Sequence, residues 1–394
     1  MGKWTLTADE CHELLRFLRL LVQTPSYSGA EEKVARIVME EMHNIGYDDV
    51  VMDDAGNVIG RIGPMEGPSL MLNSHMDTVN LADPDAWIAD PFSALISDGQ
   101  LYGLGSCDMK GGLAATVYAG ALLIRNQTHL KGPVYVTIVG LEEPAEGTCT
   151  QHILSSGMIV PTWVVIAEPS NLSVVRAQRG HMEMRVVVKG KSSHSSQPDL
   201  GKNAVYEAAR LIFGLEILAG ELVEDPFLGS GVLAVTDIKS HAVSRNAVPH
   251  KCEFVIDRRL TVGETESMAL AEVERIISRE GVNAQVQVIE EEIKAMTGKV
   301  FQARKVSLPW ALDEKHPLVL ATVSAVRNVG IKPSLTRWHF ATEGAYTASV
   351  AHIPTVGFGP GNPSLAHTSN EHIPIAQVYA AASAYAALCE ELLG

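Results

Sequence analysis

Histidine and acidic residues gather in two short segments near opposite ends of the chain, 75–77 (His-Met-Asp) and 366–371 (Ala-His-Thr-Ser-Asn-Glu). More acidic residues lie between them, namely Asp108 in a glycine-rich segment, the pair Glu142 and Glu143, and Glu168. Zinc and similar ions bind imidazole and carboxylate groups, and two neighbouring ions need about five or six such ligands. These residue types therefore predict one site for two divalent metal ions, assembled from distant segments.

The candidate ligands follow apolar runs that predict buried strands. The runs at 70–74, 134–141 and 163–167 end just before His75, Glu142 and Glu168. Helical spacing or an alanine-rich composition predicts helices at 8–23, 31–45 and 111–124. Helices that alternate with wholly apolar strands predict an α/β fold with a mostly parallel sheet flanked by helices. Ligands bind beyond the carboxyl ends of the strands in such folds, where these candidates lie.

The sequence pattern changes near residue 180. From there it predicts a strand at 181–189, a helix at 202–219, strands at 231–238 and 251–257, a helix at 264–279 and a strand at 284–289. This is the element order of a ferredoxin-like α+β domain. The α/β pattern then resumes with a helix at 315–328, a strand at 354–358 and a helix at 374–392. We therefore predict a discontinuous first domain of 1–179 and 297–394, interrupted by an inserted domain of 180–296.

Composition disfavours several classes of function. The net charge of −15 disfavours nucleic acid and anionic membranes as partners. No run of about 18 apolar residues predicts a membrane span, and the start lacks the apolar core of a secretion signal. The five cysteines are an odd number without a C-x-x-C pair, which favours a reducing compartment over a disulfide framework. We therefore predict a cytoplasmic protein.

Each candidate residue also has a structural interpretation. A lone histidine such as His75 can simply end a strand, Asp108 can start a helix, and the Glu142–Glu143 pair can belong to a solvated loop. A dinucleotide-binding loop is excluded, because Asp108 stands where the third glycine of that motif is required. Cys107 lacks the Cys-His pattern of an activated nucleophile.

The motifs together resemble a family of dinuclear metal amidohydrolases. This family includes acetylornithine deacetylase, succinyl-diaminopimelate desuccinylase, aminoacylase and carboxypeptidase G2. The resemblance rests on His-x-Asp at 75–77, Gly-x-x-Asp-Met-Lys-Gly-Gly at 105–112, Glu-Glu at 142–143, the acid at 168 and the histidine at 367, which occur in the family's order over nearly the whole chain. The chain is most similar to a deacetylase-like branch linked to selenium metabolism.

The resemblance implies a ligand set for two ions. Asp108 would bridge both ions, each carboxylate oxygen binding one of them. His75 and Glu168 would complete the first site, and Glu143 and His367 the second. Each site would keep an open position for water or substrate. Zinc is the expected metal, with cobalt or manganese as alternatives, since the ligands suit all three.

Two further acids have implied catalytic roles. Glu142 would be the general base that takes a proton from a metal-bridging water and delivers it to the leaving nitrogen. Asp77 lies two residues after His75, and side chains two apart on a strand point the same way. We therefore expect the Asp77 carboxylate to hold the other ring nitrogen of His75.

The inserted domain is implied to be a lid and the dimer interface of a homodimer. His194 would reach the active site of the partner subunit and stabilise the oxyanion on the scissile carbonyl. Asn246 would donate to the substrate carbonyl. Arg259 would bind a substrate carboxylate, and an ion pair with Asp257 is the structural alternative.

Glycines precede the C-terminal histidine. Gly359 and Gly361 are expected to bring backbone N–H groups close to the substrate, because glycine permits close approach. Five other histidines show no informative spacing and are interpreted as structural: His181, His241, His250, His339 and His352.

These features predict a metal-dependent hydrolase that cleaves the amide bond of an N-acyl amino acid. Glu168 is typical of the deacylases in the family, whereas many of its peptidases have Asp there, and 341–344 resembles a Thr-Glu element of acetylornithine deacetylases. The alternative is a dipeptidase, aminopeptidase or carboxypeptidase of the same family, acting on short peptides. A non-hydrolytic metal-binding protein would be indicated by loss of the base or of a ligand, and the full set is present.

Overall fold

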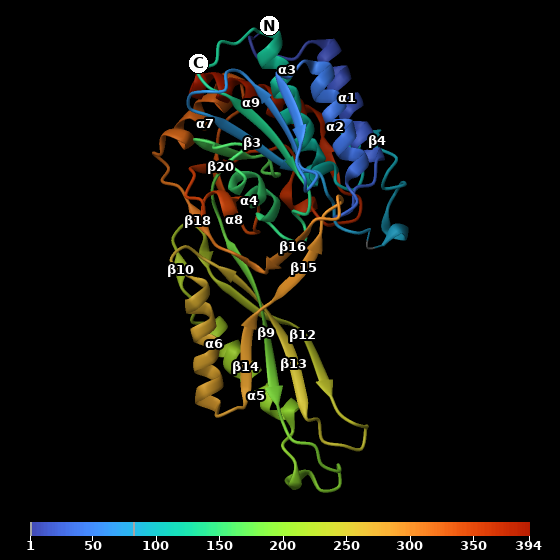
Figure 1. Ribbon diagram of the computed structural model, residues 1–394, viewed down its shortest axis with the longest axis vertical. Coiled ribbons are helices and arrows are strands. Elements are labelled where there is room, and N and C mark those ends of the chain that lie inside the picture. Colours follow the sequence, from blue (N-terminus) through green and yellow to red (C-terminus); the bar gives the residue numbers. More distant parts are fainter. Residues whose placement is uncertain (1, 82) are drawn as a thin grey trace.

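The computed structural model describes residues 2–81 and 83–394. Figure 1 shows an elongated molecule with two parts. The upper part contains a large sheet with helices around it and carries both termini, and the lower part is a smaller α+β unit. Among the described residues, no helix is both long enough and apolar enough to span a bilayer.

A nine-stranded sheet lies at the centre of the upper part, in the order β1-β2-β6-β3-β7-β20-β8-β18 with β19 beside β8. Its strands are β1 (Asp49–Met52), β2 (Val58–Ile62), β3 (Leu70–His75), β6 (Val134–Val139), β7 (Trp163–Ile166), β8 (Val174–Gln178), β18 (Trp310–Ala311), β19 (Leu335–Trp338) and β20 (Thr355–Gly357). The four central strands, β6, β3, β7 and β20, run parallel. The predicted α/β fold is confirmed, with antiparallel pairs towards the edges.

Helices pack on both faces of this sheet. They are α1 (Ala8–Gln23), α2 (Glu32–Ile45), α3 (Gly111–Arg125), α4 (Thr148–Ser155), α7 (Pro317–Asn328), α8 (Gly344–Thr347) and α9 (Ile375–Leu393). Alternate residues of β3 point to opposite faces. Leu70 and Leu72 join a core with the long helices, whereas Met71 packs in a separate core that includes residues of α4.

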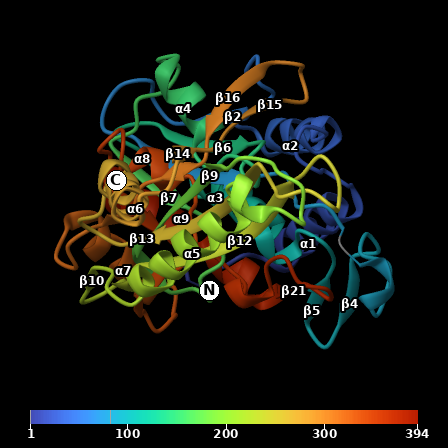
Figure 2. The ribbon, with the colours of Figure 1, turned by 90° about the horizontal axis from the view of Figure 1, so that it is seen from below.

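The lower part has a ferredoxin-like arrangement, as predicted. It contains β9 (Gly180–Lys189), α5 (Ala204–Ala219), β12 (Val232–His241), β13 (Lys251–Leu260), α6 (Glu266–Glu280) and β14 (Ala284–Val288). The antiparallel sheet has the order β12-β13-β9-β14. Every second residue of β9 is buried, because one face packs on the two helices, which lie next to each other (Figure 2).

A hairpin that the sequence did not predict links the two parts. It is formed by β15 (Glu290–Lys294) and β16 (Val300–Arg304), and it follows β14 upward in Figure 1. Its tip packs tightly on the upper part, since a Cβ at Gly56 would lie 2.2 Å from the Met296 methyl carbon. β17 (Val306–Ser307) then pairs with β9. The predicted boundary at 296 falls within this hairpin. The division of the chain at 180 and 296 stays a prediction.

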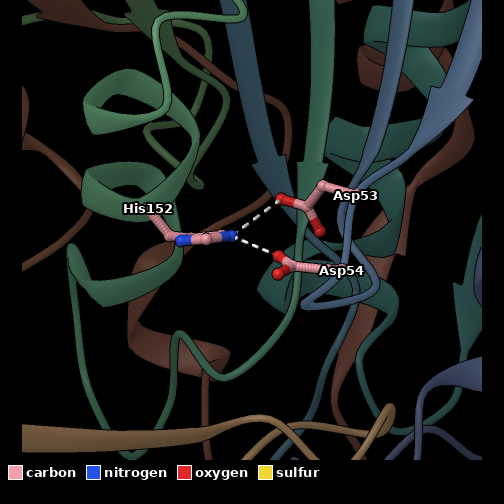
Figure 3. Close-up of side chains that lie close together, drawn as sticks. All are labelled: Asp53, Asp54 and His152. Atoms are coloured by element: carbon pink, nitrogen blue, oxygen red, sulfur yellow. Dashed lines mark hydrogen bonds and ion pairs between the residues drawn. The ribbon is translucent and has the colours of Figure 1, made fainter.

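A polar cluster holds the hairpin in place. In Figure 3 one nitrogen of the His152 ring faces the carboxylates of both Asp53 and Asp54. His152 Nε2 is 2.6 Å from Asp54 Oδ1, and the Lys299 Nζ atom of the hairpin is 2.7 Å from Asp54 Oδ2. The Asp53 carboxylate accepts backbone N–H groups of its own turn, at Ala55 and Asn57. Because Lys299 already supplies the positive charge, this cluster is a structural tie and not a metal centre.

Short elements complete the chain. They are β4 (Leu95–Ser97), β5 (Gln100–Tyr102) and β21 (His372–Pro374) in one small sheet, the pair β10 (Glu224–Asp225) and β11 (Gly229–Ser230), and the single turns Pro84–Ala86, Ser106–Lys110, Pro198–Leu200 and Pro363–Leu365. The pairing of β21 with β5 brings the C-terminal segment beside the glycine-rich segment before Asp108.

Candidate metal centre

The candidate ligands meet at one edge of the central sheet. β3 ends at His75, and the loops after β6, β7 and β20 carry Glu142 and Glu143, Glu168, and His367, respectively. Parallel strands have their carboxyl ends at the same edge, so the fold brings these loops together. His367 has a φ of 58°, which residues other than glycine rarely adopt. The surrounding loops must hold it there, as often happens at functional sites.

The two oxygens of Asp108 face two different histidines. His75 Nε2 lies 3.0 Å from Asp108 Oδ1 and 3.3 Å from Glu168 Oε1. His367 Nε2 lies 3.4 Å from Asp108 Oδ2 and 2.9 Å from Glu143 Oε2. The five residues thus form two groups of three that share one carboxylate.

These groups fit a pair of divalent ions. Ligand atoms about 2.0–2.1 Å from a tetrahedral ion are about 3.3 Å apart, close to the separations of 2.9–3.4 Å found between the histidine nitrogens and the carboxylate oxygens. One buried oxygen, Glu143 Oε1, has no hydrogen-bond partner among the described residues. Imidazole and carboxylate donors suit zinc, cobalt and manganese.

The acids are crowded into a buried space. Burial raises the pKa of Glu142, and burial together with the Asp108 charge raises the pKa of Glu168 to about 7. The hydrogen bond to Glu143 raises the pKa of His367 to about 9. Without bound cations, some of these side chains therefore keep a proton near neutral pH. Binding of cations would displace those protons.

The Asp77 carboxylate lies within ion-pair distance of the His75 ring, and its role in holding that ring stays a prediction. The strand ends at His75, so the rule for residues two apart on a strand does not extend to Asp77. His75 Nδ1 lies 3.0 Å from the backbone oxygen of Asp77 and 3.5 Å from Oδ1. The carboxylate also accepts the backbone N–H groups of Glu142 and Glu143 and the hydroxyl of Ser28. Asp77 therefore fixes the loop that carries both glutamates.

The glycines near His367 use their N–H groups within the protein, contrary to the prediction that these groups would face the substrate. Gly359 N donates to Ser170 Oγ at 3.0 Å, and Gly361 N donates to Gln377 Oε1 at 2.8 Å. A Cβ at Gly359 would lie 2.3 Å from the Glu168 backbone oxygen. These glycines permit close packing beside the cluster, because a larger residue would push the Glu168 loop away.

A cavity of about 310 Å³ opens onto the cluster. Its lining residues are Asp108, Glu142, Glu143, Glu146, Glu168, His181, Arg259, Phe340, Ala341, Ala366 and His367. Glu146 belongs to no motif that predicted a site residue, and His181 had been interpreted as structural. His181 pairs with Arg259 across β9 and β13, so both come from the lower part. The alternation of apolar and polar residues along β9 could have shown which face of the strand carries His181. It could not have shown that this face borders the cavity.

The two basic residues of the cavity wall have acidic partners. Arg259 donates from Nε and Nη2 to the Asp257 carboxylate at 2.8 and 3.0 Å, which is the structural alternative named for it. His181 lies 3.2 Å from the same carboxylate and 3.7 Å from Glu146. Burial alone would lower the pKa of His181, but Asp257 and Glu146 outweigh it and raise the pKa to about 9. A substrate carboxylate would have to compete with Asp257 for Arg259.

His194 and Asn246 lie away from this cavity. They belong to loops that follow Lys189 and precede Lys251, at the end of β9 and β13 opposite to Gly180 and Leu260. Figure 1 shows these loops at the bottom of the molecule. His194 is exposed, and its Nδ1 bonds to the Ser196 hydroxyl. Within one chain these two residues cannot reach the cluster.

Cys107 has a structural place beside the cluster. Its thiol is buried and donates to the Asn362 backbone oxygen at 3.3 Å. Burial raises the pKa of this thiol well above its ordinary value. Since a reactive cysteine must be a thiolate, the structure gives no support to a nucleophilic role.

An α/β fold with an inserted α+β domain, and a histidine–carboxylate cluster at the strand ends, define a class of metal-dependent hydrolases. The model of peptidase family M20/M25/M40 matches residues 71–391, and the chain belongs to this family. It is therefore a hydrolase of a family that acts on amide or peptide bonds.

Individual relatives cover nearly the whole chain. The uncharacterized protein YgeY of Escherichia coli strain K12 is 36% identical over 378 residues, which are 95% of this chain and 93% of YgeY. Succinyl-diaminopimelate desuccinylase of Hahella chejuensis is 24% identical over 387 residues, with 95% of each chain covered. The structure of Bacillus subtilis YXEP, described as a dinuclear metal binding peptidase from the M20 family, has a TM-score of 0.74 at 16% identity, and the match covers 98% of this chain and 99% of that one.

Proposed function

We propose that this hydrolase cleaves the amide bond of an N-acyl amino acid, giving a carboxylate and a free amino acid. The arrangement of Asp108 between two histidines carries the proposal, because it suits two ions beside a cavity of substrate size. Glu168 and the similarity to a desuccinylase favour acylated amino acids. The similarity to a dinuclear peptidase supports the alternative, a dipeptidase, aminopeptidase or carboxypeptidase.

The proposed ligands are His75, Asp108 and Glu168 for one ion and Asp108, Glu143 and His367 for the other. Two bound ions, most simply zinc, would polarise the scissile carbonyl and make a nearby water more acidic. Cobalt and manganese suit the same donors.

Glu142 is the proposed general base. It is buried, lines the cavity and has its backbone fixed by Asp77. Its carboxylate would take a proton from the attacking water, whose oxygen then bonds to the amide carbon. The carbon–nitrogen bond breaks as Glu142 returns that proton to the departing nitrogen.

We also propose a homodimer through the lower part of the molecule. Three large apolar side chains of α5, Tyr206, Phe213 and Ile217, are 71%, 65% and 60% exposed. Beside this helix, β12 is a ten-residue strand at the edge of the sheet, so one side of its backbone has no neighbouring strand among the described residues. A second copy that covered this surface could bring its own His194 to the cavity.

A cytoplasmic location is proposed from the cysteines. Among the described residues, Cys11, Cys107, Cys149, Cys252 and Cys389 are free thiols. Free thiols persist in reducing compartments.

The substrate proposal is tested with a panel of N-acetyl, N-succinyl and N-formyl amino acids and dipeptides. We expect metal-free protein to be inactive, and protein refilled with zinc, cobalt or manganese to cleave one N-acyl class. Cleavage of dipeptides alone would support the peptidase alternative, and silence across the panel with two ions bound would refute the substrate class.

Metal removal is also expected to lower the melting temperature. The buried carboxylates would lose their counter-charge, and an ion that binds only the folded state stabilises it. Calorimetry of metal-free and refilled protein measures the difference. Equal melting temperatures would contradict metal binding at this buried cluster.

Lys305 is expected to support catalysis from the lid side. Its Nζ donates to the backbone oxygen of Pro144 at 2.6 Å, next to Glu143, and lies 3.3 Å from Glu291 of the hairpin. Lys305→Met should lower kcat by about tenfold or more, since small misplacements of catalytic groups are costly. Lys305→Arg should restore part of the loss, and metal content should not change. An unaltered kcat in Lys305→Met would show that the contact does not position the loop.

A further inference from the structure

We propose that Glu371 is a positioning residue that sets the orientation of Asp108 for two metal ions. This proposal rests on the bridging role proposed for Asp108. Glu371 belongs to the same segment as His367, but neither its residue type nor its spacing indicated a separate role.

The Glu371 carboxylate accepts three backbone N–H groups of the Asp108 loop. Oε1 accepts from Cys107 N at 2.7 Å and Asp108 N at 2.9 Å, and Oε2 accepts from Gly105 N at 2.9 Å. The residue is only 1% exposed. Three backbone N–H groups enclosed in the protein thus depend on this one side chain, and a buried donor without an acceptor is costly.

The backbone of Glu371 is itself fixed. Its oxygen accepts from Gly103 N at 3.0 Å, and the next residue, His372, pairs with Tyr102 in the small sheet. The segment 366–371 therefore has two roles. Its Glu371 holds the loop of Asp108, and its His367 is itself a proposed ligand. The two ligands come from distant parts of the sequence, and Glu371 sets where one loop lies relative to the other.

The backbone conformation of the Asp108 loop depends on Gly105 as well as on the Glu371 carboxylate. Gly105 has a φ of 76°, and a Cβ there would lie 2.5 Å from the Thr78 methyl carbon. The loop thus depends on a conformation that glycine allows and that the three hydrogen bonds hold. Without the carboxylate, three buried N–H groups would lose their acceptor, which is costly.

The variant Glu371→Gln tests the positioning role with little change of shape. The amide keeps one acceptor oxygen but replaces the other with an NH₂ group, which cannot accept. At least one of the three backbone N–H groups of the Asp108 loop therefore loses its acceptor. A matched control is Asp53→Asn. Asp53 also accepts several N–H groups of its own turn, with a side chain 4% exposed, but outside the metal centre.

The experiment measures metal binding and not turnover. Titration calorimetry with zinc, and electron paramagnetic resonance of manganese-loaded protein, should show two coupled ions in the natural protein and in Asp53→Asn. Glu371→Gln should bind at least one ion about 10–100-fold more weakly, the usual effect of losing a group that orients a ligand, and the coupling between ions should change. Two ions bound with natural affinity and coupling by folded Glu371→Gln would overturn the proposal.

A second measurement needs only the natural protein, so it tests the proposal even if Glu371→Gln does not fold. In the natural protein, hydrogen exchange of the N–H groups of Gly105, Cys107 and Asp108 should be slow even without metal, because Glu371 holds them in advance. Fast exchange that becomes slow only on metal addition would overturn the proposal. Inactivity towards N-acyl amino acids would refute the proposed substrate and leave these two readouts unaffected.

Discussion

Glu142→Gln is expected to lower kcat at least about a hundredfold while two metal ions stay bound, since a general acid–base group contributes about 10²–10⁴-fold. The amide is nearly the same shape but cannot accept a proton from water. The Asp77 contact to the backbone of this residue should survive, because it does not involve the Glu142 side chain. Steady-state kinetics and metal analysis of the same preparation measure both effects.

Glu146→Gln is the matched control for this experiment. Glu146 lines the same cavity but lies near His181 and accepts from the Ser307 hydroxyl at 3.4 Å. Its change should affect kcat much less than Glu142→Gln. If Glu142→Gln keeps turnover within about tenfold of the natural enzyme, Glu142 is not the base.

Mixing two inactive variants is expected to restore activity. His194 is remote from the cavity of its own chain, so the proposed dimer would have to supply it from the partner. In a mixture of His194→Ala and Glu142→Gln, each mixed dimer has one site with an intact Glu142 and an intact His194. Random exchange of subunits should therefore recover about a quarter of the natural activity.

Assay of the mixture after subunit exchange measures this recovery. Each variant must be nearly inactive when pure, and both must form dimers by light scattering. The matched control mixes Glu142→Gln with His75→Ala, in which the mixed dimer has no site with both residues intact. Recovery should be absent there. Absence of recovery with His194→Ala despite mixed dimers, or full activity of a monomer, would contradict the role of His194 across subunits.

The elements were predictable because their signals are local. Apolar runs and helical spacing placed α1, β3, α3 and α9 within a few residues, and the capping box of Thr7 and Glu10 marks the start of α1. The ends of apolar strands also indicated where His75 and Glu168 would lie. The prediction of helices and strands, and the placing of ligands at strand ends, both need only residues that are close in the sequence.

Contacts across distant segments were not predictable in the same way. In the hairpin of β15 and β16, the first strand is mainly charged and most residues of both strands are exposed, so no strand pattern indicated it. The position of His181 on the cavity wall depends on how two parts of the molecule meet. The strand ends at His75, so the alternation rule did not show that the backbone oxygen of Asp77 would lie nearer to the His75 ring than its carboxylate.

The strands that enter and leave the lower part lie side by side, and this has an evolutionary consequence. His181 of β9 pairs with Ser307 of β17, so the insertion begins and ends at nearly the same point. A unit with adjacent ends can be gained, lost or exchanged as one piece without rearranging its host. That unit carries His181 and Arg259, whereas the residues around Asp108 belong to the host. The wall that meets the substrate can therefore diversify while the hydrolytic chemistry is inherited unchanged.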